Sequence, residues 1–152
     1  MITKKEAGTV NGKAVAQYTL ENENGLAMTF YTYGGIIQSL LVKDRQGIAR
    51  DVELGFDTLD EYVKAACYYG APIGRYANRI NQGKIVLDGD TIQLAQNNFG
   101  HCLHGGPKGW QYQVYNANPI DSTTLELPAF HRMETRISRA TLRQKCTFRV
   151  NG

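Results

Sequence analysis

Residues 73–83 concentrate hydrogen-bonding side chains in a short stretch of the chain. The segment holds two arginines and two asparagines, Arg75, Asn78, Arg79 and Asn81. An asparagine beside an arginine offers several N–H donors along one edge, which suits the hydroxyl groups of a sugar. The same residues also fit a solvated polar turn with one structural salt bridge, so the segment alone leaves both interpretations open.

A second candidate segment, residues 97–106, combines histidine with glycine. His104 precedes Gly105 and Gly106, and glycine allows close approach of the backbone to a ligand. His104 is therefore either a catalytic residue or a structural histidine whose nitrogens are satisfied within the protein. His101 lies three residues before His104. The glycine-rich setting is not helical and supplies no third ligand, so we expect no metal site.

The turns that must position these segments are marked by Asx-Gly pairs. Such pairs accept the positive φ that tight hairpins require. Three of them lie between apolar, β-branched or aromatic runs: Asn11-Gly12, Asn24-Gly25 and Asp88-Gly89. Apolar and polar residues alternate within 16–20 and 29–33, as half-buried strands require. The pattern predicts a mainly β, antiparallel fold.

One short helix is expected among these strands, over residues 58–66. Asp57 or Thr58 can cap its N-terminus, and Asp60 and Glu61 lie in the first turn, where the helix dipole favours acidic residues. Residues 36–42 are predicted to form a further strand, followed by a turn at 44–47.

Charge, hydropathy and cysteine content exclude several classes of protein. The net charge is +3, and much of the positive excess lies in 131–145, so we expect no nucleic-acid and no membrane partner. No apolar stretch is long enough for a signal peptide or a membrane span. The three cysteines are odd in number and form no CxxC pair, which favours reduced thiols and a cytoplasmic protein.

Taken in order, the motifs resemble the galactose mutarotase (aldose 1-epimerase) family. Residues 74–80 read Gly-Arg-Tyr-Ala-Asn-Arg-Ile, and residues 103–106 read Leu-His-Gly-Gly. Further matching runs are Tyr-Gly-Gly-Ile-Ile-Gln-Ser-Leu at 33–40 and Asp-Val-Glu-Leu-Gly-Phe-Asp at 51–57. The resemblance extends over residues 5–127.

This resemblance implies a galactose mutarotase-like antiparallel β-sandwich and an isomerase that needs no cofactor. The reaction interconverts the α and β anomers of free hexoses such as galactose or glucose. A base removes the proton of the C1 hydroxyl while an acid protonates the ring oxygen, and the ring opens and recloses. By resemblance, Asn78 and Arg79 bind sugar hydroxyls, and His104 holds the sugar near its ring oxygen. Arg75 belongs to the same motif, but its expected role is structural and not sugar binding.

The resemblance also predicts a truncated sandwich. Members of the family are longer, and their later half supplies a second histidine as general acid and a glutamate as general base. We therefore expect this acid and base beyond Gly152, no catalytic residue within 1–152, and a chain that is inactive or weakly active. A truncated sandwich exposes apolar surface and unpaired strand edges, which favours oligomers or aggregates.

The sequence after Leu127 departs from the family. Relatives carry an Asp-Gly-Asp-Gln-Gly-Phe-Pro-Gly loop there, whereas residues 131–142 match nothing in it. Because the genetic code is degenerate, codons can be selected that encode this segment. When these codons are read one base out of phase, they translate as Asp-Gly-Asp-Gln-Asp-Phe-Pro-Gly-Asn. This predicts two parts: 1–127, the N-terminal part of a mutarotase-like sandwich, and 128–152, an anomalous tail that arises from a frameshift.

Two other functions are compatible with the same residues. The first alternative is a non-catalytic carbohydrate-binding β-domain, in which Asn78, Arg79 and His104 bind the sugar. It is also similar to epimerases that act on hexose 6-phosphates, although the first hundred residues show no cluster of basic residues for a phosphate.

Overall fold

The computed structural model describes residues 1–65, 67–132 and 141–150, with side chains described outside 129–145. The chain is built mainly of strands, which pair only in antiparallel fashion within the described residues. The strands are β1 Ile2–Val10, β2 Lys13–Glu21, β3 Ala27–Tyr31, β4 Ile37–Lys43, β5 Ala49–Asp51, β6 Arg79–Ile80, β7 Lys84–Leu87, β8 Asp90–Gln93, β9 Cys102–Leu103, β10 Asn118–Pro119, β11 Thr124–Arg132 and β12 Thr141–Arg149. The helix α1 is Leu59–Lys64.

The first five strands form one sheet in the order β1-β2-β3-β4-β5. Each strand follows its neighbour directly, so the sheet is a meander of the kind that short Asx-Gly turns produce. The turn between β1 and β2 has Asn11 and Gly12 at φ 52° and 74°, and Asn24-Gly25 lies between β2 and β3. The predicted strand over 36–42 is confirmed as β4, and the predicted turn at 44–47 follows it.

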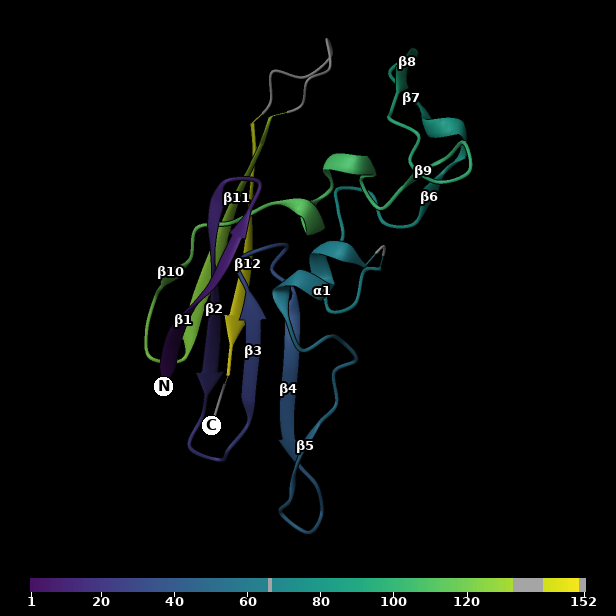
Figure 1. Ribbon diagram of the computed structural model, residues 1–152. Helices are drawn as coiled ribbons and strands as arrows, with labels where there is room; N and C mark the ends of the chain where they lie inside the picture. Colours follow the sequence, from purple (N-terminus) through teal and green to yellow (C-terminus); the bar gives the residue numbers. More distant parts are fainter. Residues whose placement is uncertain (66, 133–140, 151–152) are drawn as a thin grey trace.

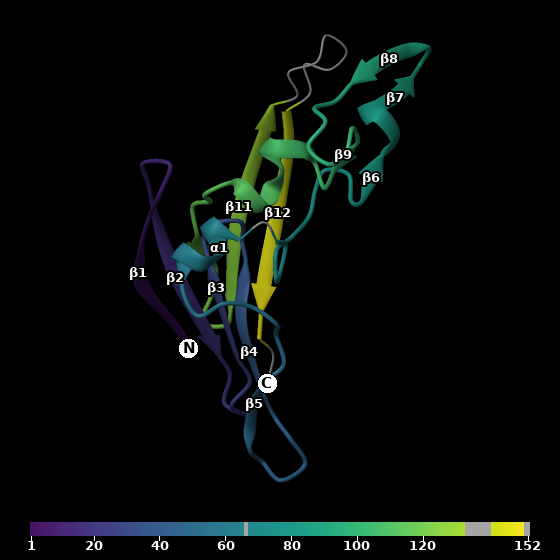
Figure 2. The same ribbon diagram turned by 45° about the vertical axis from the view of Figure 1, so that its right-hand side comes forward.

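A second sheet, in the order β10-β11-β12, packs against the first. Figure 1 and Figure 2 show β11 and β12 as a separate layer beside β1–β3. The core between them includes Leu20, Phe30, Leu125 and Phe148. The rings of Phe30 and Phe148 stack with centroids 4.3 Å apart. The predicted mainly β antiparallel sandwich is confirmed by these layers.

The helix α1 covers a second apolar cluster, to which Val15, Tyr31, Leu59 and Tyr62 belong. The predicted helix over 58–66 is confirmed over Leu59–Lys64, with Thr58 as its N-cap. The Thr58 hydroxyl accepts from the backbone of Glu61, and the Glu61 carboxylate accepts from the backbone of Thr58, so both ends of a capping box are present.

The strands β6, β7, β8 and β9 form an arm that extends away from the sandwich (Figure 1). Within the arm β6 pairs with β9, and β7 pairs with β8 in a hairpin. Asp88 and Gly89 form the turn of that hairpin, at φ 51° and 86°. The prediction of a hairpin over 84–94 is therefore confirmed.

The predicted boundary between residues 127 and 128 falls inside β11. This strand pairs along its length with β12, from Thr124 opposite Arg149 to Arg132 opposite Thr141. Phe148 is buried in the core. Residues 133–140 and 151–152 of the predicted anomalous tail lie outside the described residues, and the division into two parts stays a prediction.

In the described part of the chain no helix has the length and apolar character needed to cross a membrane.

Candidate functional site

The two motifs singled out in the sequence meet at the pairing of β6 with β9. Arg79 lies opposite Leu103 in this antiparallel pair. Asn78 precedes β6 and His104 follows β9, so the pairing brings these two residues together. The backbone N–H of His104 donates to the Asn78 carbonyl at 3.0 Å. The backbone N–H of Asn78 donates to the Nδ1 of His104 at 3.0 Å.

This second bond assigns the proton of the His104 ring. A backbone N–H only donates, so Nδ1 must accept, and the proton of a neutral imidazole then resides on Nε2. His104 thus carries an Nε2–H donor at the edge of the arm. Such a donor suits an acceptor oxygen of a ligand.

Arg79 is held beside Asn78 by two further bonds. Its Nε donates to the Oδ1 of Asn98 at 2.8 Å, and its Nη1 donates to the Oδ1 of Asn78 at 3.4 Å. Asn78 and Arg79 are both solvent-exposed, whereas His104 is half-buried. The structure therefore brings together all three residues that the sequence predicts as ligand contacts, on an open edge. Their role in binding stays a prediction.

Glycine allows the two motifs to approach this closely. A Cβ on Gly105 would lie 2.0 Å from the carbonyl oxygen of Gly74, and a Cβ on Gly74 would lie 2.2 Å from the ring of Trp110. The backbone N–H of Trp110 also donates to the carbonyl of Gly74, at 3.3 Å. The glycines of both motifs are thus required for the backbones to cross in contact.

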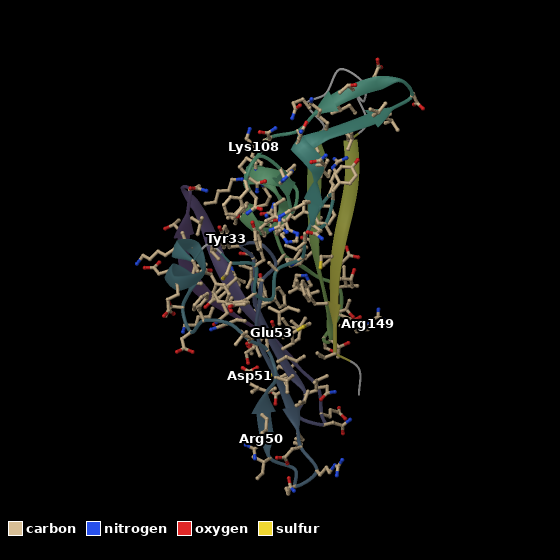
Figure 3. The ribbon with its side chains drawn as sticks, turned by 90° about the vertical axis from the view of Figure 1, so that its right-hand side faces the viewer. Tyr33, Arg50, Asp51, Glu53, Lys108 and Arg149 are labelled. Carbon is tan, nitrogen blue, oxygen red and sulfur yellow. The ribbon has the colours of Figure 1, made fainter. Side chains whose placement is uncertain are left out.

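The buried side-chain amide of Gln111 is hydrogen-bonded to the backbone of His104. The Nε2 of Gln111 donates to the His104 carbonyl at 3.1 Å, and Gln111 is 3% exposed. Gln111 belongs to the 3-10 helix Trp110–Tyr112, next to the 3-10 helix Gly106–Lys108. Figure 3 labels Lys108 of this segment, between the arm and Tyr33 of the sandwich. The segment therefore connects the arm to the sandwich.

Tyr68 contacts His104, a neighbour that the sequence did not predict. Its ring meets the His104 ring edge to face, with centroids 4.7 Å apart and planes at 65°. Burial, followed by a hydrogen bond to Tyr112, raises the pKa of Tyr68 to about 12, and the nearby Arg79 charge acts in the opposite direction. The many tyrosines of the chain are typical of strands and of carbohydrate-binding surfaces, but nothing in the sequence distinguished Tyr68 from the others.

His101 has a different role from its neighbour. Its Nδ1 accepts from the backbone N–H of Gln82 at 3.0 Å, so it fixes the short 3-10 helix Asn81–Gly83 that follows β6. Within the described residues no three histidine, cysteine or acidic side chains gather in a way that could hold a metal ion.

The general acid and general base expected by resemblance are not placed by the structure. They are predicted to lie beyond Gly152, and Gly152 itself lies outside the described residues. The expectation that residues 1–152 contain no catalytic residue therefore stays a prediction.

Comparison with known proteins places this chain in a family. The family model described as aldose 1-epimerase matches residues 16–151. The chain therefore belongs to the aldose 1-epimerase family.

Relatives of known name agree with this assignment. A galactose mutarotase from Bos taurus is 45% identical over 116 residues, which cover 76% of this chain and 32% of that protein. An aldose 1-epimerase from Escherichia coli (strain K12) is 32% identical over 121 residues, covering 78% of this chain and 35% of that protein. The chain thus spans about a third of the length of the curated relatives it matches.

Solved structures have the same fold. A GalM/aldose epimerase homologue from C. elegans superimposes with a TM-score of 0.79 at 30% identity, covering 88% of this chain and 41% of that one. A galactose 1-epimerase from Lactobacillus acidophilus NCFM gives a TM-score of 0.81 at 22% identity, covering 97% of this chain and 43% of that one, and is similar in fold.

Proposed function

We propose that the chain supplies the sugar-binding edge of an aldose 1-epimerase that acts on free hexoses such as galactose or glucose. The observation that carries the proposal is the meeting of Asn78, Arg79 and His104 at the β6–β9 pairing. Membership of the family supports the reaction class. The preferred hexose is left for the experiment to decide.

The hydrogen-bond donors of this edge suit a hexose whose ring opens during anomer interconversion. Anomer interconversion breaks the bond between C1 and the ring oxygen, after an acid gives the ring oxygen a proton and a base takes one from the C1 hydroxyl. In this proposal the Nε2–H of His104 donates to the ring oxygen and holds it in place. Arg79 and Asn78 donate to hydroxyl groups, and the planar guanidinium fixes their direction.

We assign the general acid and the general base to residues other than these three. Among the described residues no carboxylate is hydrogen-bonded to Asn78, Arg79 or His104. General acid and general base catalysis each contribute on the order of 10²- to 10⁴-fold. From the resemblance alone, we propose that the 152-residue chain binds hexose and interconverts anomers at close to the uncatalysed rate.

Two measurements on the same preparation test the proposal. Galactose is titrated against the fluorescence of Trp110, the one tryptophan of the chain, which lies against Gly74 at the site. Polarimetry on fresh α-galactose then measures turnover. Saturable binding with slow mutarotation supports the proposal, and the absence of saturable binding contradicts it.

The open position of the site favours one alternative, a non-catalytic carbohydrate-binding β-domain. Asn78 and Arg79 are both exposed, as in a surface that binds without enclosing its ligand. Both candidates predict saturable binding, and they differ in turnover. A slow mutarotation that rises with protein concentration supports the epimerase, whereas a rate that stays at the uncatalysed value at every protein concentration supports this alternative. Tighter binding of galactose 6-phosphate than of galactose would instead support a hexose-6-phosphate 1-epimerase relative.

A further inference from the structure

Tyr68 comes from outside both motifs and reaches His104 from the sandwich side. The backbone N–H of Ala71 donates to the Tyr68 carbonyl at 3.2 Å, which closes a turn over 68–71. That turn is attached to the start of β4, because the N–H of Ile37 donates to the Gly70 carbonyl at 2.9 Å. The backbone of Tyr68 is therefore held by the attachment of its turn to the five-stranded sheet.

Glycine is required for this attachment. Gly70 has φ 62°, and a Cβ there would lie 2.0 Å from the carbonyl oxygen of Ile37. Any other residue at this position would move the turn away from β4. The turn thus holds the half-buried Tyr68 in one place relative to the sandwich.

The contact between the two rings restricts His104. Two aromatic rings at 4.7 Å and 65° have the edge-to-face geometry that aromatic pairs prefer. The bond from the Asn78 N–H fixes Nδ1, and Tyr68 closes one side of the imidazole. Together they hold the ring in one plane, so the Nε2–H has one direction.

We infer that Tyr68 is a positioning residue of the sugar site, which orients the His104 imidazole through its ring. This inference rests on the proposed function. It deepens that function by adding Tyr68 to the edge formed by Asn78, Arg79 and His104, and it explains how a site on the arm is aligned with the sandwich.

The test compares Tyr68→Leu with Tyr68→Phe in the full 152-residue chain. Tyr69→Leu is the matched control, because Tyr69 is the next residue and its ring contacts Phe56 instead of His104. The imidazole signals of His104 are measured by NMR without sugar, and the affinity for galactose is measured by Trp110 fluorescence. Tyr68→Leu is expected to shift the His104 signals and weaken galactose binding about 2- to 10-fold. Tyr68→Phe restores both in large part, and Tyr69→Leu changes neither.

A double variant separates positioning from general damage. In the His104→Asn background the Tyr68→Leu change is expected to have little further effect on galactose affinity, since Tyr68 acts through the imidazole. Equal losses in both backgrounds would overturn the inference, as would His104 signals that stay in place in Tyr68→Leu. A wild-type chain that binds no galactose would contradict the proposed function itself, whatever the NMR signals show.

Discussion

Gly74 and Gly105 lie so close that a Cβ on Gly105 would be 2.0 Å from the carbonyl oxygen of Gly74. The two motifs that resemble the epimerase family therefore cross backbone against backbone. This crossing brings the residue after β9 next to the residue before β6.

Gly105→Ala is expected to destabilise the chain more than Gly89→Ala. Both glycines have similar positive φ, 81° and 86°, but a Cβ on Gly89 meets nothing within 4 Å. The backbone strain of about 1 kcal/mol or more is common to both, so the difference measures the Gly74 contact. Urea denaturation of the two variants supplies the comparison. Equal midpoints would mean that the motifs do not cross as described.

Phe148→Ala is expected to destabilise the chain by about 3–5 kcal/mol, because it removes a buried ring that stacks on Phe30. Thr147→Ala, an exposed neighbour on the same strand, should change stability by no more than about 0.5 kcal/mol. Denaturation midpoints measure both. If Phe148→Ala has no effect, β12 is not part of the sandwich, and the tail is a dispensable addition.

The origin of that tail is a separate prediction. The frameshift hypothesis for residues 128–152 requires gene codons that regroup, one base out of phase, to the loop expected by resemblance. Sequencing the gene across the codons for residues 128–152 tests this hypothesis directly. Codons that do not regroup would contradict the hypothesis.

Acid is expected to destabilise the chain partly through Asp44. The side chain of Arg50, together with the backbone N–H of Ile48, lowers the pKa of Asp44 below its ordinary value of 3.8. Because the pKa is lower in the folded state, this contribution is fully present above the unfolded value and is lost as pH falls below 3.8 through the folded value. Unfolding of Asp44→Asn should therefore depend less on pH in this range than that of the wild type. An unchanged dependence would contradict the assignment, and Glu23→Gln serves as the exposed control.

Arg79→Lys is expected to weaken galactose binding by about tenfold or more, since charged hydrogen bonds contribute about 1.5–3 kcal/mol and lysine lacks the planar fork of arginine. Asn98→Ala should weaken binding less, because it removes only the acceptor that orients the Arg79 Nε. Fluorescence titration measures both variants. A larger loss in Asn98→Ala than in Arg79→Lys would mean that Arg79 does not contact the sugar.

Local signals in the sequence predicted much of the sandwich. The turns at Asn11-Gly12, Asn24-Gly25 and Asp88-Gly89 were predictable because glycine and Asx residues are needed where φ is positive. The helix α1 was predictable from its cap at Thr58. The strand β12 was missed, because its basic residues were interpreted as part of an anomalous tail.

The composition of the site was predictable only in part. Resemblance selected Asn78, Arg79 and His104, but β6 and β9 have two residues each, too few for any periodicity to predict their pairing. Tyr68 was missed because its contact with His104 spans a long stretch of chain and depends on the attachment of Gly70 to β4. Such contacts arise from tertiary packing and leave no local pattern.

Two histidines in matching environments allow a direct test of the central claim. The Nδ1 atoms of His101 and His104 each accept from a backbone N–H at 3.0 Å. Asparagine places its Oδ1 where Nδ1 was, tolerates positive φ, and lacks a donor in place of Nε2–H. His104→Asn therefore removes the proposed sugar contact while keeping the acceptor, and His101→Asn is its matched control.

The deciding measurement is the galactose affinity of these two variants, by titration of Trp110 fluorescence. His104→Asn should weaken binding about 2- to 10-fold, the loss of one hydrogen bond of about 0.5–1.5 kcal/mol, while His101→Asn binds like the wild type. Equal affinity in His104→Asn and the wild type would contradict the account, because the edge formed by Asn78, Arg79 and His104 would then not be where the sugar binds.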